Sequence, residues 1–355
     1  MSQRSAQWSA CLVFALLLPL IPGVFLNVQT DTILDNEKRR AIVTAIAHAI
    51  ESNYVFPERA EEMARLLRER NSSHRYDGLT ENAGLAKQLT ADLYEEAHDR
   101  HIKVFPPDDA KHNSFFDSEN HAQNDAWVNE GFSEARRLAG NVGFLKVDRL
   151  LATDAAADAA NAAMNFLAHA GALIIDLRDN HGGSPEMIRL LCTYLFGPDR
   201  HVHLSDFQWR GQSGLVESYT LASIPGKSFA DKTVFVLTSH RTFSGAEELA
   251  YDLQSLRRAT IIGEVTGGGA NPGRIFELPQ GFSIFIPTGR AINPVTKTNW
   301  EGIGVKPDIE VPEALALDTA HLAALRAITK SAQLYLAEQQ EVRDAIKSLE
   351  AGTLH

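Results

Sequence analysis

Apolar residues recur at helical spacing along the first part of the chain. The segments DNEKRRAIVTAIAHAIESNYV, PERAEEMARLLRERN and TENAGLAKQLTADLYEEAH, between Asp35 and Asp99, all show it, and this spacing is typical of amphipathic helices. Pro57 opens the second segment, at a favoured first position of a helix. We therefore expect residues 35–107 to form a small N-terminal helical bundle domain.

The pattern changes after a polar stretch at residues 108–130, which we interpret as a linker. VGFLKV, ALIIDLR, TVFVLT, ATIIGE and FSIFIP are short apolar runs typical of buried strands, and several alternate with helical patterns. This alternation predicts an α/β domain with a largely parallel sheet over residues 131–312. Residues 313–355 return to a helical pattern and are expected to form a C-terminal helical segment.

The first thirty residues differ from the rest of the chain. Arg4 precedes the apolar run ACLVFALLLPLIPGVFL, which Pro19 and Pro22 interrupt. The run is short for a membrane span, and a positive start before an apolar middle fits a secretory signal peptide. We expect residues 1–30 to export the protein to the periplasm or the medium, with an uncleaved membrane anchor as the open alternative.

Composition and charge narrow the function classes. The chain has 355 residues, 44% of them hydrophobic, which suffices for one large core or two moderate ones. Its net charge of −11 argues against a nucleic-acid partner. Cys11 lies in the leader and Cys192 in a predicted helix, so removal of the leader would leave no internal disulfide. Cys192 is expected to be a small core residue.

A serine stands on the corner between a predicted strand and a predicted helix. TVFVLTSH is followed by RTFSGAEELAYDL, with Ser244 at the start of the helical pattern. Ser244 and Glu247 match the S-x-x-E capping box, which satisfies free amides at a helix start. A hydroxyl at such a corner is also well placed to act as a nucleophile. The residues alone leave both interpretations open, and the two roles are compatible.

Two glycine-rich loops follow other predicted strands. In IIDLRDNHGGSPEMIRLL, Gly182 and Gly183 could direct amides at one point, as an oxyanion hole requires, or could form only a tight turn. The loop GEVTGGGANPG contains Gly267 and Gly268 but lacks the G-K-[ST] of a phosphate loop, so nucleotide binding is not expected. We expect this loop to edge a substrate cleft.

Two further regions offer candidate side chains. His98 and His101, in EEAHDRHIKV, would lie one turn apart on a continuous helix and could hold a metal. No H-E-x-x-H motif occurs, and His101, before the strand-like IKVF, is the better candidate for a base. Glu301, in NWEGIGVKPDIEV, could be a site residue or only a surface carboxylate.

Taken together, these motifs resemble a known family. LIIDLRDNHGG, LTSHRTFSGAEE, GEVTGGGANPG and NWEGIGVKPDIEV, in this order, look like the serine peptidases that include tail-specific proteases and the tricorn core protease. Interphotoreceptor retinoid-binding protein belongs to the same family, and the helical stretch before HDRHIKV is similar to the N-terminal domain of its branch. The resemblance runs from about Asp35 to Pro312 and implies a crotonase-like α/β spiral with a helical domain.

The resemblance also implies roles for individual residues. Ser244 matches the nucleophile, and the amide of Gly245 matches one oxyanion donor. The second donor would come from the HGG turn, with Gly182 the expected one and Gly183 beside the substrate. His101 matches the base histidine of the tricorn-like branch, and Glu301 matches the acid that supports it.

Two departures from the family pattern limit what carries over. The tail-specific proteases use a lysine base in a loop that reads TGGGANPG here, without a lysine. Their peptide-binding PDZ domain has no room in residues 108–130, because small domains start at about 50 residues. We therefore expect a histidine-based site and no recognition of protein tails through such a module.

The expected function is that of an exported serine peptidase acting on peptides or unfolded protein segments, without a cofactor or metal. Two alternatives stay open. One is a non-catalytic binder of a small apolar ligand, such as a retinoid or lipid, on the same fold. The other is an esterase that uses the same residues; the missing leading glycine of G-x-S-x-G argues against an α/β-hydrolase esterase.

Overall fold

The computed structural model describes residues 34–107, 124–331 and 334–352, which all fall in one compact unit. The expected leader at residues 1–30 and most of the polar stretch 108–130 lie outside the described residues. Within the described ranges, no helix combines the length and apolar character needed to cross a membrane. The division of the chain into domains stays a prediction, and the paragraphs below describe its packing.

Three helices form the N-terminal part, as the hydrophobic spacing predicts. They are α1 (Asn36–Asn53), α2 (Pro57–Ser72) and α3 (Asn82–Ala97). Asp35 caps α1 by accepting a hydrogen bond of 2.8 Å from the amide of Lys38, because a short carboxylate at this position satisfies a free donor. Their shared core is built from the apolar stripe of each helix, including Ile42, Met63 and Leu89.

A small antiparallel sheet completes this core. Its strands are β1 (Lys103–Phe105), β10 (Ser283–Pro287) and β9 (Gly273–Glu277), in the order β1-β10-β9. The run FSIFIP therefore does not join the parallel sheet with which its pattern groups it. Side chains alternate along a strand, so Ile284 and Ile286 are buried in the core shared with the helices while Phe285 lies on the opposite face of the strand and is only partly buried.

The predicted α/β sheet is confirmed. Six strands lie in the order β12-β8-β7-β4-β3-β2, and all neighbours are parallel except β2 and β3. Their bounds are β2 Phe132–Leu138, β3 Val142–Val147, β4 Ala172–Asp176, β7 Thr233–Thr238, β8 Thr260–Gly263 and β12 Ile309–Glu310. Strands buried on both faces read as continuous apolar runs, which explains why VGFLKV, ALIID and TVFVLT show no alternation.

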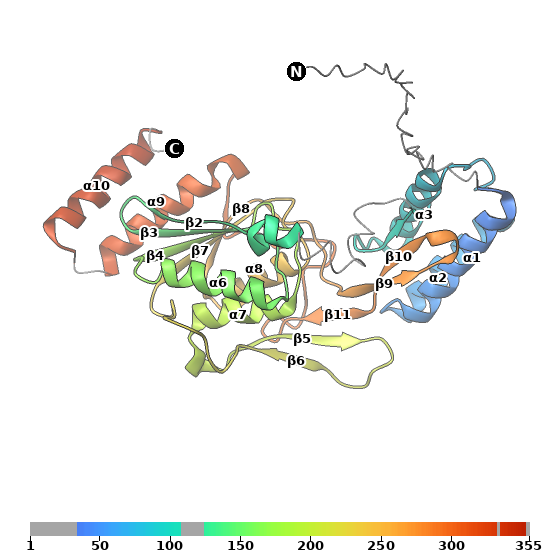
Figure 1. The fold of residues 1–355 in the computed structure, drawn as a ribbon, viewed down its shortest axis with the longest axis horizontal. Helices are drawn as coiled ribbons and strands as arrows, with labels where there is room; N and C mark the ends of the chain where they lie inside the picture. The colour runs from blue at the N-terminus through green and yellow to red at the C-terminus, as the bar shows by residue number, and fades with distance from the viewer. Residues whose placement is uncertain (1–33, 108–123, 332–333, 353–355) are drawn as a thin grey trace, which may run out of the picture. The chain divides into compact units, whose positions relative to one another are not determined.

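Helices cover both faces of this sheet (Figure 1). On one face, α6 (Asp154–Phe166), α7 (Pro185–Phe196) and α8 (Gly245–Ser255) pack against the side chains of Leu145 and Ile175. On the other face, α9 (Glu313–Ser331) and α10 (Leu336–Glu350) bury Phe144 and Ile174. The C-terminal helical segment is thus a layer of the α/β sandwich.

A second small sheet, β11-β5-β6, lies beside the core. It contains β11 (Gly289–Ile292), β5 (His203–Trp209) and β6 (Val216–Tyr219), all antiparallel. Short 3-10 turns occur at Asn129–Gly131, Pro198–Arg200 and Pro279–Gly281. Cys192 is fully buried in α7, so the prediction of a small core residue is confirmed, and burial raises the pKa of its thiol.

Candidate active site

Ser244 lies on the corner that joins β7 to α8, at the carboxyl edge of the parallel sheet. Its backbone has φ +53° and ψ −124°, a conformation that a non-glycine residue rarely adopts. A backbone hydrogen bond fixes the residue before it, because the amide of Phe243 donates to the carbonyl of Asn180 over 3.0 Å. Carboxyl edges of parallel strands are where α/β folds place their ligands.

Glu247 fixes this corner from inside the protein. Its carboxylate, which is fully buried, accepts from the amide of Ser244 at 2.8 Å, the half of the capping box that the glutamate supplies. It also accepts from Thr266 Oγ1 and from the amides of Gly268 and Gly269, at 2.5, 2.7 and 2.8 Å. The sequence pattern indicated the cap but not the link to the glycine-rich loop.

His101 reaches Ser244 from the N-terminal part of the chain. Its Nε2 lies 3.0 Å from Ser244 Oγ, within hydrogen-bond distance. The ring packs between the rings of Phe243 and Phe285, at centroid distances of 4.6 and 5.8 Å. Burial lowers the pKa of His101, and the negative charge of Asp99 opposes this shift only in part. The resting imidazole is therefore neutral near pH 7 and can accept a proton.

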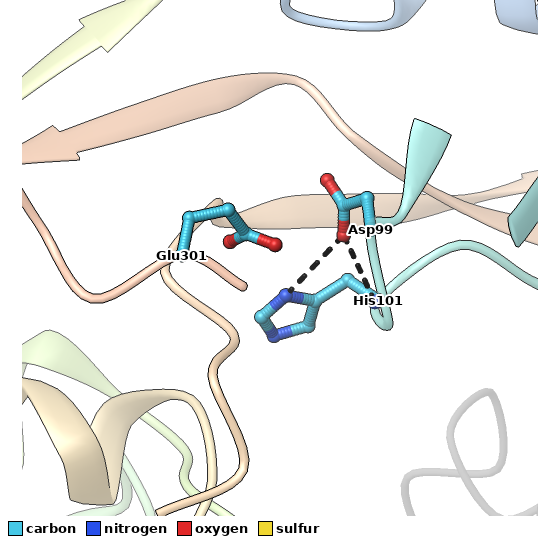
Figure 2. Close-up of side chains that lie close together, drawn as sticks. All are labelled: Asp99, His101 and Glu301. Carbon is cyan, nitrogen blue, oxygen red and sulfur yellow. Dashed lines mark hydrogen bonds and ion pairs between the residues drawn. The ribbon is translucent and has the colours of Figure 1, made fainter. Parts of the chain in front are cut away.

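Two carboxylates lie on the far side of the imidazole (Figure 2). Asp99 Oδ1 accepts from the backbone amide of His101 at 3.0 Å and lies 3.9 Å from its Nδ1. Tyr54 and Asn271 each donate to Asp99 Oδ2 over 3.1 Å, which fixes the carboxylate. Asp99 is not among the site residues predicted from the sequence, although it stands two residues before His101 in HDRH.

Glu301 is the second of these carboxylates. Its Oε2 accepts from the amide of Ala270 at 2.6 Å, while its Oε1 has no hydrogen-bond partner among the described residues. Burial, with a further contribution from the nearby charge of Asp99, raises the pKa of Glu301 to about 8. No hydrogen bond joins the side chains of Glu301 and His101 among the described residues, because Glu301 Oε1 and His101 Nδ1 both lack a partner there.

The same three residues form a group that could hold a cation. One ligand atom from each of Asp99, His101 and Glu301 lies within 4.8 Å of the others. His98 is not part of this group. Helix α3 ends at Ala97, and His98 is an exposed C-cap residue with φ +54°, so the two histidines do not lie on consecutive turns of one helix.

The amides of the HGG turn differ in what they already bind. The amide of Gly182 donates to Asn180 Oδ1 at 2.8 Å, so it is occupied. Gly183 and Gly245 both line the cavity in front of Ser244. The two residues lie close together, since a Cβ atom placed on Gly245 would be only 3.1 Å from the amide nitrogen of Gly183. The Gly183 amide is therefore the better candidate for the second oxyanion donor. Its φ of +141° requires glycine.

The glycine-rich loop lies behind the cavity more than along it. The amide of Gly267 donates to the carbonyl of Thr242 at 2.9 Å, and that of Gly268 donates to Glu247. Neither glycine lines the cavity, whereas Gly269 does. Gly267 and Gly268 thus shape the loop, and the expectation that they contact substrate directly has no support from this geometry.

The cavity in front of Ser244 has a volume of about 460 Å³. Its walls are largely apolar and include aromatic residues from several segments: Phe207, Trp209, Phe243, Phe285 and Trp300. Ser244, His101 and Glu248 are also among the residues that line it. Among the described residues that line it there is no lysine. The arrangement can hold an extended chain whose carbonyl reaches Ser244.

Two family models match different parts of this chain. A family model described as peptidase family S41 matches residues 141–311. A second model, described as the N-terminal domain of peptidase S41 in eukaryotic IRBP, matches residues 28–132. The two models follow each other in chain order and together match most of the sequence.

Similar proteins are known at the level of sequence and of fold. The chain is 30% identical over 148 residues to carboxyl-terminal-processing peptidase 2, chloroplastic, from Arabidopsis thaliana, covering 41% of this chain and 27% of that protein. A carboxyl-terminal-processing protease from Picosynechococcus sp. is 29% identical over 140 residues, 39% of this chain and 32% of its own length. The matched region thus spans about a third or less of these relatives.

Solved structures share the fold over a larger part of the chain. A lipoprotein from Streptococcus agalactiae matches 87% of this chain and 99% of its own at a TM-score of 0.57 and 13% identity. The tricorn protease matches 89% of this chain and 37% of its own at a TM-score of 0.51 and 12% identity. At these identities the similarity establishes the fold alone, and it agrees with the expected α/β architecture.

Proposed function

Because this chain belongs to peptidase family S41, we propose that it is a serine peptidase with Ser244 as nucleophile and His101 as general base. One observation carries the proposal: the 3.0 Å contact between Ser244 Oγ and His101 Nε2, at a corner that opens into a cavity. A nucleophile within hydrogen-bond reach of its base is the arrangement that activated-serine chemistry requires.

The proposed reaction follows from the positions of these groups. His101 Nε2 takes the proton of Ser244 as Oγ attacks the peptide carbonyl, and then gives it to the leaving amine. Water, activated by the same imidazole, hydrolyses the resulting acyl-enzyme. The amides of Gly245 and Gly183 would hold the oxyanion, in place of the Gly182 amide that binds Asn180.

Asp99 and Glu301 support the base in this proposal. Both carboxylates lie on the Nδ1 side of the ring, where negative charge favours the imidazolium that forms during attack. The proposal thus assigns to Glu301 the supporting role that its sequence motif implies and adds Asp99 as a second positioning residue. The lack of lysine along the described cavity wall agrees with an imidazole base.

Substrate class and location belong to the same proposal. An open cavity beside the nucleophile suits an extended segment, so peptides or unfolded protein regions are the proposed substrates. The apolar run within residues 1–30 supports export, with a retained membrane anchor as the alternative form. The curated relatives that match are named for carboxyl-terminal processing, but the chain covers only part of them.

A fluorophosphonate probe tests the proposal directly. The probe should label the wild type at Ser244 and leave Ser244→Ala unlabelled, and the variant should lose hydrolysis by a factor on the order of 10⁶ in kcat. Matched peptide and ester panels then separate a peptidase from an esterase by their relative kcat/KM. Absence of labelling in the correctly folded wild type would favour a ligand-binding protein on this fold.

A further inference from the structure

We propose that Glu248 forms the end of a substrate subsite for a cationic side chain, lysine or arginine, next to the bond that is cleaved. This inference rests on the proposed function, since it names the substrate class of the same site. It starts from a buried carboxylate that the proposed mechanism does not use.

Glu248 lies one helical turn beyond the nucleophile. Its amide donates to the carbonyl of Ser244 over 3.0 Å, so the two residues stand on the same side of α8. Both residues line the same cavity. A substrate carbonyl at Ser244 therefore brings the neighbouring substrate side chain toward Glu248.

Glu248 differs from its neighbour Glu247 in what it binds. The Glu247 carboxylate accepts four hydrogen bonds, whereas the Glu248 carboxylate has no hydrogen bond or ion pair among the described residues. Only 7% of Glu248 is exposed. An unpaired buried carboxyl group is costly, so its retention at a cavity wall points to a partner that enters with the substrate.

The electrostatic surroundings favour a positively charged partner. Burial, with a smaller contribution from the negative charge of Glu186, raises the pKa of Glu248 to about 8. Asp252, one turn along α8, is a second buried acid, and burial and the charge of Glu248 raise its pKa as well. A cation placed between these groups and the solvent would relieve their mutual repulsion, whereas an acidic side chain would add to it.

The cavity walls suit the remainder of a lysine or arginine side chain. Phe207, Trp209 and Trp300 line the same cavity as Glu248 and contribute aromatic surface to its walls. Long cationic side chains bury their methylene stems on apolar surface while the charged end reaches a polar group. A cation near an aromatic face gains further attraction. A neutral apolar side chain would fill the walls but leave Glu248 unpaired.

A binding measurement tests the subsite without catalysis. In Ser244→Ala protein, benzamidine should bind roughly tenfold or more tightly than neutral benzamide, the scale of a hydrogen bond to a charged group, by isothermal titration calorimetry. Adding Glu248→Gln should abolish this difference. Equal affinities for the two compounds in Ser244→Ala protein would overturn the subsite.

Peptides test the same inference in the wild type. For substrates that differ only in the residue before the cleaved bond, kcat/KM should be roughly tenfold or more higher for lysine than for norleucine. Glu248→Gln should reverse this order with its melting temperature retained, and Glu62→Gln, an exposed change on α2, should keep it. Cleavage without a preference for the cation overturns the subsite and keeps the proposed function. Discrimination by benzamidine in a protein that cleaves no peptide supports the subsite and rejects the peptidase.

Discussion

Ser244 and His101 lie 3.0 Å apart, yet the regions that hold them differ in construction. The serine corner is built from continuous chain: β7 enters it, α8 leaves it, and the backbone of Phe243 is bonded to the neighbouring turn. The histidine corner has no regular element of its own. It follows the end of α3 and depends on side chains such as Asp99 and Phe285.

This difference predicts how substitutions in each region would affect folding and activity. The serine corner is part of the α/β core, so changes there should affect folding and activity together. The position of the histidine depends on a few side-chain contacts, so changes there should alter the rate and its pH dependence while the fold remains. The three predictions below test this contrast, from the largest expected effect to the smallest.

Of these three predictions, removal of His101 should give the largest effect on rate. His101→Ala is expected to lower kcat/KM by roughly 10²–10⁴-fold, because the serine loses its general base. The melting temperature should change little. His98→Ala is the matched control and should keep nearly full activity, since His98 is exposed and points to no described site residue. Equal losses from both variants, restored by zinc, would instead indicate a metal site.

Removal of Glu247 should damage the serine corner through the fold. Glu247→Ala leaves four buried donors without their acceptor, which should cost roughly 3 kcal/mol or more in the free energy of unfolding. Activity should fall as well, since Ser244 loses an anchor. Urea unfolding and kcat/KM measure the two losses.

The adjacent acid provides the comparison for this variant. Glu248→Gln removes no described hydrogen bond and should not destabilise the protein at pH 8, because it replaces a buried group that ionises there. If both variants lost the same stability, the contrast between a bonded and an unbonded glutamate would be wrong.

The smallest expected effect is on the pH dependence of kcat/KM, which depends on the residues around His101. Burial lowers the pKa of His101, so kcat/KM should rise with pH in a step below about 6.5, where the neutral base forms. A second, smaller rise should follow near pH 8 as Glu301 ionises and stabilises the imidazolium. Glu301→Gln should remove only the upper step.

Removal of the Asp99 charge should shift both steps in the pH profile of kcat/KM in the same direction. Its charge raises the pKa of His101 and of Glu301, so Asp99→Asn should move both steps to lower pH.

The pH dependence of protein stability gives an independent check on the raised pKa of Glu301. The pKa of Glu301 is raised from 4.5 to about 8 by folding, so its contribution is present below pH 4.5 and is lost as the pH rises to about 8. Glu301→Gln should thus be more stable than the wild type above pH 8, and an unchanged difference across this range would contradict the assignment.

Local patterns were sufficient for the elements and for the serine corner. Helical spacing predicted α1, α2 and α3, and continuous apolar runs predicted β3, β4 and β7. A helix that buries one stripe and a strand that buries both faces each require a specific order of apolar residues, which can be seen in the sequence. The strand, Ser244 and the acid at position 247 are adjacent in sequence. Their geometry therefore follows from neighbouring residues, as does the place of Glu247 in the cap.

Only the tertiary structure decided the rest of the candidate site. His101 and Ser244 are separated by 143 positions, and their contact depends on β10, which pairs with β1 and turns Phe285 toward the imidazole. The sequence likewise indicated neither the bonds of Glu247 to the glycine-rich loop nor the place of Glu248 at the cavity wall, and it could not distinguish the amide of Gly182 from that of Gly183. Folding brings hydrogen-bond donors from distant segments, and these donors decide which of two adjacent polar groups is bonded and which faces a cavity. The residue order along one element does not show where those donors will lie.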